Sequence, residues 1–256
     1  MKVSDLVILK KDVDPIIYII EEINDEDVLL KGYTHRIVRK TKLDKVTEAP
    51  LTLVEKEEKL KHSYERSLLI KGKLRNNKTP LFGRVLHIDG DQEYLDSCIA
   101  LYKEVGIHVD GIYIKEKELK DKIEDIILTL TPDIVVITGH DVYNGKGIKE
   151  LSNYENTNNF IDAIRKIRKH FSQDSMCIIA GACGSNFEAL IASGANFASS
   201  PKRINIHTYD PAVIAIKVAS TSCNKTIDFE GCLRLIEKGR EAFGGIETNG
   251  KMKILL

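Results

Sequence analysis

The chain of 256 residues carries 38 Lys and Arg against 38 Asp and Glu, so its formal charge is zero. Without a basic excess, it lacks the electrostatic footprint of a dedicated nucleic-acid-binding protein. No apolar stretch approaches the roughly 20 residues of a membrane span. A chain of this length holds one large domain, or a domain of about 100–200 residues with a smaller module. We therefore expect a globular protein with neither nucleic acid nor membrane as a partner.

The cysteines and the start of the chain indicate a cellular compartment. Five cysteines occur without CxxC spacing: Cys98, Cys177, Cys183, Cys223 and Cys232. An odd set of this kind favours neither a disulfide framework nor a structural zinc site. The stretch Met1–Asp5 contains an acid and leads into no long apolar segment, which argues against a secretory signal. We expect a protein of the reducing cytoplasm.

Residues 1–52 predict a small SH3-like β-barrel. Short apolar runs between turn-prone residues are typical of strands. The expected strands are Val3–Leu9, Ile16–Ile23, Val28–Leu30 and Arg36–Val38. Lysines and arginines between Lys31 and Lys45 give this module a basic side. We interpret it as an adaptor or protein-binding module.

Residues 53–82 predict a charged helix followed by a linker. From Leu53 to about Arg75 the chain is highly charged, with Leu and Tyr at helical intervals, which indicates an exposed helix. The stretch Lys71–Pro80 is polar and basic and contains Gly and Pro. Exposed segments of this composition are preferred sites of proteolysis, so we expect a linker or a cleavable loop.

Residues 83–256 alternate between strands and helices. The expected strands are Val85–Asp89, Val109–Ile114, Asp133–His140, Cys177–Cys183 and Asn196–Ser199. The expected helices are Gln92–Val105, Glu116–Leu130, Asn159–Phe171, Ser185–Ser193, Pro211–Ala219 and Glu230–Glu241. A turn between two short strands is expected over residues 244–256. This order predicts an α/β fold with a doubly wound, mainly parallel sheet, right-handed crossovers and helices on both faces.

Two of these apolar runs end on chemically useful residues. Asp133–His140 ends in an imidazole, and Met176–Cys183 ends in a thiol. Both runs are short and rich in Ile and Val, as buried parallel strands are. Chemistry in an open α/β sheet gathers at the carboxyl ends of the strands. If the strands are neighbours, Cys183 and His140 form the nucleophile and base of a cysteine peptidase.

The residues around Cys183 suit this chemistry. A free thiol has a pKa of about 8.5, and a nearby imidazole or the start of a helix favours the thiolate. Ser185 and Asn186 can cap the helix that follows Cys183. The backbone amides of Cys183 and Asp141 are candidate donors to the oxyanion. Such a mechanism requires no metal and no organic cofactor.

The spacing of these residues resembles that of the caspase and clostripain type of cysteine peptidase. His140 precedes Cys183 by 43 residues, and an apolar run leads to Ala182-Cys183-Gly184. The caspase signature likewise has Ala-Cys with a His about 50 residues upstream. The chain departs from that type at Asp141 and Gly181, where Gly and an acidic or amide residue are usual. The resemblance implies a caspase-like fold for residues 83–256.

A second resemblance extends over nearly the whole chain. Its segments are Val85–Asp91, Ile137–Asp141, Ala180–Cys183, Ala192–Pro201, Ile204–His207 and Gly244–Thr248. They resemble the YabG family of sporulation-specific cysteine proteases from spore-forming bacilli and clostridia. The resemblance implies an endopeptidase that trims spore coat and cortex-related proteins in the mother cell, often beside Arg or Lys, with self-cleavage as a further expectation. It also implies that Cys183 is the nucleophile and His140 the base.

Cleavage beside a basic residue requires a carboxylate in the substrate pocket, because carboxylates bind Arg strongly and with defined geometry. Candidates for this pocket, which we call the S1 pocket, are Asp89, Asp91 and Asp141, and we favour Asp89. Asp141 is also a candidate to orient His140. Each of these residues has an alternative interpretation as a turn or helix-capping aspartate. For self-cleavage, the stretch Lys71–Lys78 is preferred over Lys202–Arg203.

Two other interpretations remain open. One is a non-catalytic coat scaffold, with a flavodoxin-like sheet joined to the small barrel. The other is a phosphatase of the haloacid-dehalogenase type, suggested by Asp89 and Asp91 at a strand end, which would need Mg²⁺ but not Cys183. Thiol-sensitive cleavage of an Arg-containing substrate distinguishes the peptidase from both. The oligomeric state is left open.

Overall fold

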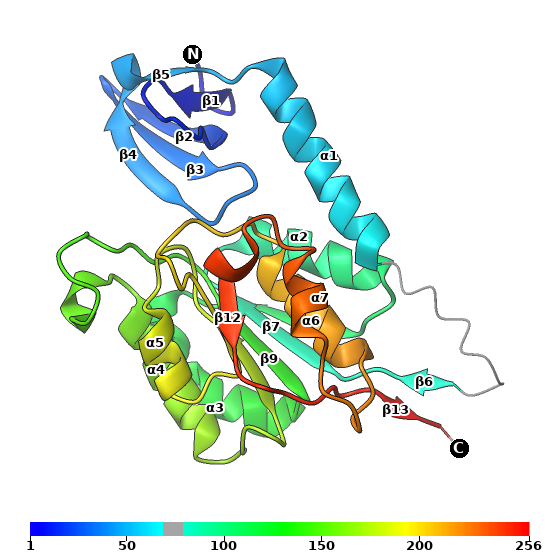
Figure 1. The fold of residues 1–256 in the computed structure, drawn as a ribbon. Coiled ribbons are helices and arrows are strands. Elements are labelled where there is room, and N and C mark those ends of the chain that lie inside the picture. The colour runs from blue at the N-terminus through cyan, green and yellow to red at the C-terminus, as the bar shows by residue number, and fades with distance from the viewer. Residues whose placement is uncertain (69–78, 256) are drawn as a thin grey trace.

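The computed structural model describes residues 1–68 and 79–255. An N-terminal sheet lies over one edge of a larger α/β sheet, and a long helix runs down beside both (Figure 1). That helix, α1 (Leu51–Leu68), is followed by residues 69–78, so most of the predicted linker lies outside the described residues. Pro80 lies instead in a short strand, β6 (Pro80–Leu81), which pairs with β13 (Lys253–Ile254) near the carboxyl end.

The N-terminal sheet is antiparallel and has the strand order β4-β3-β2-β1-β5. Its strands are β1 (Leu6–Leu9), β2 (Tyr18–Asn24), β3 (Asp27–Gly32), β4 (Val38–Lys42) and β5 (Val46–Glu48). Apolar side chains from neighbouring strands, among them Val7, Tyr18, Ile20, Val28 and Leu30, form a small core. The antiparallel module is therefore present, while its SH3-like class stays a prediction.

The predicted strand Arg36–Val38 is wrong in its position. β3 ends at Gly32 and β4 begins only at Val38, so residues 33–37 form a connection that we call the Arg36 loop. Its backbone does not continue the ladder, because Arg36 donates its amide hydrogen to Ile206 of the larger sheet's loops. The sequence predicted four or five strands but gave no range for β5, whose three residues carry little apolar pattern.

The larger sheet has the order β12-β11-β10-β9-β7-β8, and all neighbours are parallel except β11 and β12. Its strands are β7 (Val85–Asp89), β8 (Val109–Tyr113), β9 (Ile134–Thr138), β10 (Cys177–Ala180), β11 (Phe197–Ser199) and β12 (Phe243–Gly245). Every residue of β7, β9 and β10 is buried. Strands covered on both faces require such continuous apolar runs, which is why the sequence identified them.

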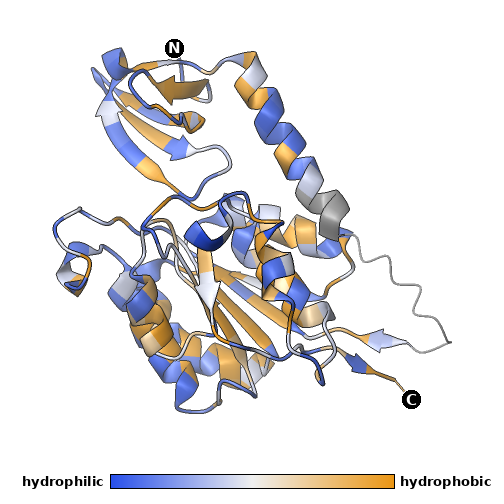
Figure 2. Cartoon of the chain, in the orientation of Figure 1, coloured by the Kyte–Doolittle hydropathy of each residue, from blue (hydrophilic) through white to orange (hydrophobic). Residues whose placement is uncertain are grey.

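Helices cover both faces of this sheet (Figures 1 and 2). One face packs against α2 (Gln92–Glu104), α6 (Asp210–Ser220) and α7 (Phe229–Leu233). The other packs against α3 (Leu119–Leu130), α4 (Thr157–Arg168) and α5 (Phe187–Ala192). The α/β fold with parallel strands is confirmed, and its caspase-like class stays a prediction. Across the described helices, none combines the length and apolar character that crossing a membrane would require.

Two expectations near the carboxyl end need correction. The predicted helix Glu230–Glu241 is only α7 and a 3-10 turn, Gly239–Glu241. Gly239, the first residue of this turn, adopts φ +47°, a left-handed conformation that a continuous right-handed helix does not contain. The two final strands do not pair with each other, because β12 joins the larger sheet and β13 joins β6.

Candidate active site

The two strands that lead to His140 and Cys183 are direct neighbours. β9 and β10 run parallel, and Ile137 pairs with Ala180. Both strands are shorter than predicted, so His140 lies two residues beyond β9 and Cys183 three residues beyond β10. The fold thus brings both loops to the carboxyl edge of one sheet, as the sequence pattern required.

The imidazole of His140 is oriented by Asp91. His140 Nε2 lies 3.1 Å from Asp91 Oδ2, and the His140 amide donates to Glu116 Oε1 at 2.7 Å. Within the described residues, His140 Nδ1 is buried and has no hydrogen-bond partner. A neutral imidazole that donates from Nε2 to a carboxylate keeps a lone pair on Nδ1. The ring therefore offers a proton acceptor at Nδ1.

Asp91 stays ionised in this arrangement. Its side chain caps α2 by accepting from the amides of Glu93 and Tyr94, and Lys31 Nζ lies 2.9 Å from its Oδ1. Burial acts to raise the pKa of Asp91, but hydrogen bonds from His140 and Lys31 and the Lys31 charge outweigh it and hold the pKa well below its usual range. The sequence analysis considered Asp91 for the S1 pocket or as a helix cap, and it does cap α2. Its contact with His140 was not predicted.

Cys183 is a buried thiol at the end of a tightly fixed loop. Its side chain is 3% exposed, and Sγ accepts the amide hydrogen of Ile206 at 3.3 Å. Burial raises the pKa of the Cys183 thiol to about 12, although the amides of Ile206 and Arg36 and the Arg36 charge act to lower it. The thiol is therefore neutral near pH 7 in this state.

The loop that carries Cys183 is held by glycine geometry and hydroxyl groups. Gly181 adopts φ +107°, and a Cβ there would lie 2.4 Å from Ser199 Oγ. The Ala182 carbonyl accepts from Ser199 Oγ at 2.8 Å, and its amide donates to Ser185 Oγ at 2.9 Å. In the described part of the chain, the amide of Cys183 donates to no acceptor. It is thus available to bind a negatively charged oxygen.

Asp141 ties the two loops together. Its carboxylate accepts from the Asn156 amide at 2.7 Å and from Ser185 Oγ at 2.8 Å, and it also bonds Thr157 Oγ1. Burial raises the pKa of Asp141, and these hydrogen bonds act against the rise. Because both carboxylate oxygens are engaged, these contacts favour a structural role over the S1 pocket or the orientation of His140. The Asp141 amide makes no hydrogen bond within the described residues.

Asp89 faces an arginine that the sequence analysis did not single out. Asp89 and Arg36 are both fully buried and form an ion pair. Asp89 Oδ2 also accepts from Thr138 Oγ1 at 2.9 Å. Burial acts to raise the pKa of Asp89, but the Arg36 charge and hydrogen bonds lower it to about 2. In this state the Asp89 carboxylate is engaged by the Arg36 guanidinium.

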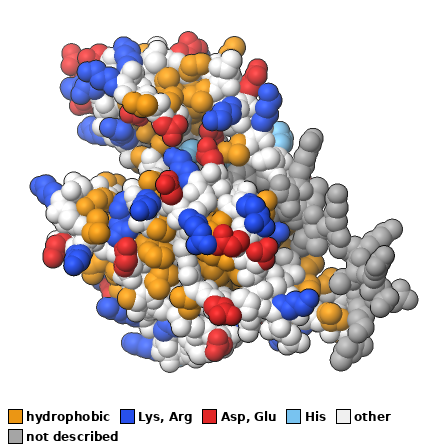
Figure 3. Space-filling view, viewed as in Figure 1, with side chains coloured by type: hydrophobic (Ala, Val, Ile, Leu, Met, Phe, Trp, Pro, Cys, Tyr) orange, Lys and Arg blue, Asp and Glu red, His pale blue; other side chains and the backbone are white. Residues whose placement is uncertain are grey.

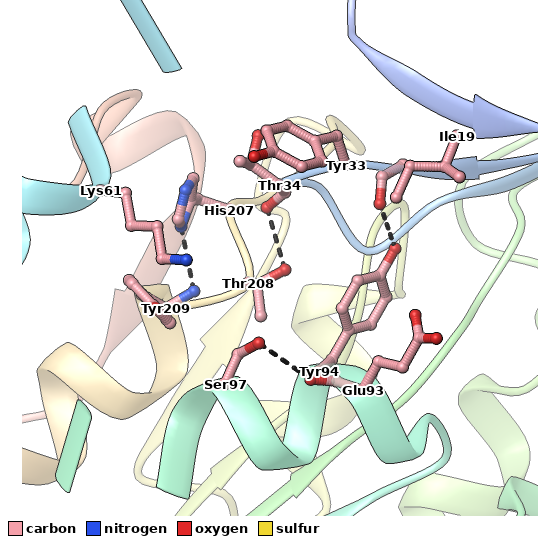
Figure 4. Close-up of a pocket in the computed structure, with 11 residues that line it drawn as sticks. Ile19, Tyr33, Thr34, Lys61, Glu93, Tyr94, Ser97, His207, Thr208 and Tyr209 are labelled. Atoms are coloured by element: carbon pink, nitrogen blue, oxygen red, sulfur yellow. Dashed lines mark hydrogen bonds between the residues drawn. The ribbon is translucent and has the colours of Figure 1, made fainter. Parts of the chain in front are cut away.

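A pocket of about 160 Å³ lies next to this region (Figure 4). Its walls include Tyr33, Thr34, Tyr94, Ser97, His207 and Tyr209. The pocket therefore adjoins the Arg36 loop and α2, and neither His140 nor Cys183 lines it. On the face shown in Figure 3, acidic and basic side chains are interspersed, in keeping with the zero net charge.

In the class of open α/β sheets, ligands bind at the carboxyl ends of the strands, and the thiol and the imidazole lie beyond those ends of two adjacent parallel strands. The chain belongs to the YabG peptidase family U57, whose model matches residues 2–256. A relative described as the sporulation-specific protease YabG of Bacillus subtilis (strain 168) is 43% identical over 175 residues, which cover 67% of this chain and 60% of the relative. The match therefore spans less than two thirds of that relative. No solved structure was found to match the chain.

Proposed function

We propose that this chain is a cysteine endopeptidase of sporulation, with Cys183 as the nucleophile and His140 as the general base and acid. The observation that carries the proposal is the state of His140, whose Nε2 contacts Asp91 while Nδ1 is buried without a partner among the described residues. A buried nitrogen without a hydrogen bond costs folding free energy, and a site that uses His140 Nδ1 to accept a proton explains why this nitrogen is left without a partner. Membership of a peptidase family supports the same conclusion.

The chemistry follows from these groups. His140 Nδ1 takes the proton of the Cys183 thiol, and the thiolate attacks the carbonyl carbon of the scissile peptide bond. The amides of Cys183 and Asp141 hold the resulting oxyanion. The imidazolium then protonates the leaving amine, which departs as the carbon–nitrogen bond breaks. Water, deprotonated by His140, hydrolyses the thioester and restores the thiol.

The proposed substrates are spore coat and cortex-related proteins, cut beside Arg or Lys in the mother-cell cytoplasm. The fully buried Asp89 supports the basic preference, because a desolvated carboxylate selects for a guanidinium or ammonium partner. Its present partner, Arg36, is evidence that the position accepts an arginine side chain. Self-cleavage remains part of the proposal.

A cleavage assay tests this function. The purified chain is incubated with an Arg-containing coat-protein fragment, and products are followed by mass spectrometry. We expect cleavage that iodoacetamide blocks and that both Cys183→Ala and His140→Ala abolish. Cys223→Ala is the matched control, because Cys223 is a partly exposed thiol far from the His140 loop in sequence. Normal cleavage by folded Cys183→Ala would refute the assignment, and an inert wild-type chain would favour the scaffold.

A further inference from the structure

The Arg36 loop runs alongside residues 206–208, which follow β11, as an extended segment. The Thr208 amide donates to the Thr34 carbonyl at 2.8 Å, and the Arg36 amide donates to the Ile206 carbonyl at 3.3 Å. Between these bonds, His35 pairs with His207 in an antiparallel bridge. Extended peptides bind to protein edges by this backbone pattern, with alternate side chains entering pockets.

The side chain that enters a pocket is that of Arg36. It is fully buried, pairs with Asp89, and donates from Nη2 to the Thr208 carbonyl at 3.1 Å. The Tyr94 ring lies 5.4 Å from its guanidinium carbon, within reach of a cation–π contact. The pocket thus supplies an acidic, a carbonyl and an aromatic partner for one guanidinium.

The same residue brings its backbone to the thiol. Ile206 accepts from the Arg36 amide through its carbonyl and donates its own amide to Cys183 Sγ. Burial raises the pKa of the Cys183 thiol, and the Arg36 amide acts against that rise. The residue whose side chain fills the acidic pocket is therefore the residue whose backbone lies beside the proposed nucleophile.

We propose that residues 34–36 occupy the substrate cleft as an internal substrate mimic, with Arg36 in the S1 pocket formed by Asp89. This proposal rests on the proposed function and adds its regulation. A substrate arginine has to displace Arg36 before it reaches Cys183. The N-terminal sheet is then a built-in inhibitor of the peptidase, and the intact chain is its closed state.

Further contacts hold this closed state. The Tyr94 hydroxyl lies 2.7 Å from the Gly32 carbonyl and 2.8 Å from the His35 carbonyl. Thr34 Oγ1 donates to Glu57 Oε2 of α1 at 2.5 Å. Lys31 reaches from β3 to Asp91, the residue that orients His140. Contacts with α1 and α2 therefore hold the loop, and Lys31 links the adjoining strand β3 to α2, so that opening requires these contacts to break.

The test uses the full chain and an active-site reagent, a peptidyl-arginine chloromethyl ketone. Labelling of Cys183 is followed by mass spectrometry in wild type, Arg36→Ala and the control Lys40→Ala, which changes an exposed cation of β4. If the open state is about a tenth of the population, emptying the pocket raises the apparent affinity about tenfold. We expect Arg36→Ala to be labelled at least about tenfold faster at limiting reagent, with Lys40→Ala unchanged.

A second reagent and a second variant complete the test. Iodoacetamide reports only the accessibility of Cys183 and should also label Arg36→Ala faster. Arg36→Lys keeps the positive charge and most of the aliphatic side chain. If Arg36→Ala fails to fold, a smaller increase in the rate of Cys183 labelling in Arg36→Lys supports the proposal, and an unchanged labelling rate overturns it. A wild-type cut between Arg36 and Ile37 that is absent from Cys183→Ala also supports it, because the proposal places Arg36 in the substrate cleft beside Cys183.

The outcomes separate the two proposals. Equal or slower labelling of folded Arg36→Ala by both reagents, in a wild type that cleaves substrate, overturns the substrate mimic and leaves the peptidase intact. If the arginine reagent labels no variant and no substrate is cut, the proposed function fails and the mimic falls with it. Iodoacetamide rates then still tell whether the loop shields Cys183.

Discussion

Arg36 and Asp89 lie 53 residues apart and form a fully buried ion pair between the N-terminal sheet and the end of β7. Removing one partner of such a pair leaves the other charge desolvated, which typically costs about 3–5 kcal/mol. The pair therefore couples the docking of the N-terminal sheet to the state of the proposed S1 pocket. Substitutions at either residue should change both stability and peptidase activity.

Asp89→Asn should affect both properties. Losing the charged contact is expected to lower the ratio of kcat/KM for an Arg substrate to that for a Gln substrate by about 10–100-fold, since such hydrogen bonds contribute about 1.5–3 kcal/mol. The unpaired Arg36 should also lower the free energy of unfolding by about 3–5 kcal/mol. Peptide kinetics with Arg against Gln, together with urea unfolding, measure the two effects. In an Arg36→Ala background the stability loss should shrink, and an undiminished loss would contradict the pairing.

Asp91→Asn should impair catalysis without preventing substrate binding. An amide at this position no longer favours the imidazole tautomer with a lone pair on Nδ1, so kcat should fall by about 10²-fold or more while KM changes little. The matched control is Glu93→Gln, which removes another carboxylate contact of Lys31 but does not touch His140. Steady-state kinetics separate them, and equal losses in both variants would contradict the positioning role of Asp91.

The reactivity of Cys183 should depend steeply on pH in the closed state. Burial raises the pKa of the thiol to about 12. At pH 8 such a group is thiolate in about one molecule in 10⁴, against about a quarter for a free cysteine. Iodoacetamide labelling of Cys183 should therefore be far slower than that of Cys223 and should keep rising through pH 10. A labelling rate that stops rising near pH 8 would show that the pKa of the Cys183 thiol is not raised.

Buried His35 should make the chain less stable in acid. Burial lowers the pKa of His35 to about 4, and Lys238 acts in the same direction while Asp14 opposes it. Its contacts include Thr34 Oγ1, Glu237 and the ring of His207. Because the unfolded chain binds a proton at His35 near pH 6.5 and the folded chain does not, stability is present above about pH 6.5 and is lost as pH falls towards 4. His35→Gln should weaken this pH dependence in urea unfolding.

Gly181→Ala should cost more stability than Gly106→Ala. Both glycines have positive φ, but a Cβ at Gly106 meets nothing within 4 Å, whereas one at Gly181 would lie 2.4 Å from Ser199 Oγ. Backbone strain accounts for about 1–2 kcal/mol at each site, and overpacking adds about 1–3 kcal/mol at Gly181. Thermal unfolding compares the pair, and peptidase activity should fall only in Gly181→Ala because the loop carrying Cys183 shifts.

The sequence located the sheet better than it located the contacts between distant segments. β7, β9 and β10 are buried on both faces, so their continuous apolar runs carried a strong signal. No local pattern predicted the burial of Arg36, because its partner Asp89 lies 53 residues away and the neighbouring sequence does not distinguish Arg36 from an exposed basic residue. The helix-capping interpretation of Asp91 is confirmed, but its contact with His140 depends on how α2 lies against the loop after β9, which no local pattern reveals.

The short ladder between β6 and β13 has a consequence for processing of the chain. Leu255 donates its amide to the Thr79 carbonyl, and Lys253 pairs with Leu81. Residues 253–255 are thus hydrogen-bonded to the first strand of the α/β portion, β6, and this pairing does not depend on the peptide bonds that connect β6 to α1. Cleavage of the backbone between α1 and Thr79 would remove the covalent link to the N-terminal sheet while β6 and β13 remain paired.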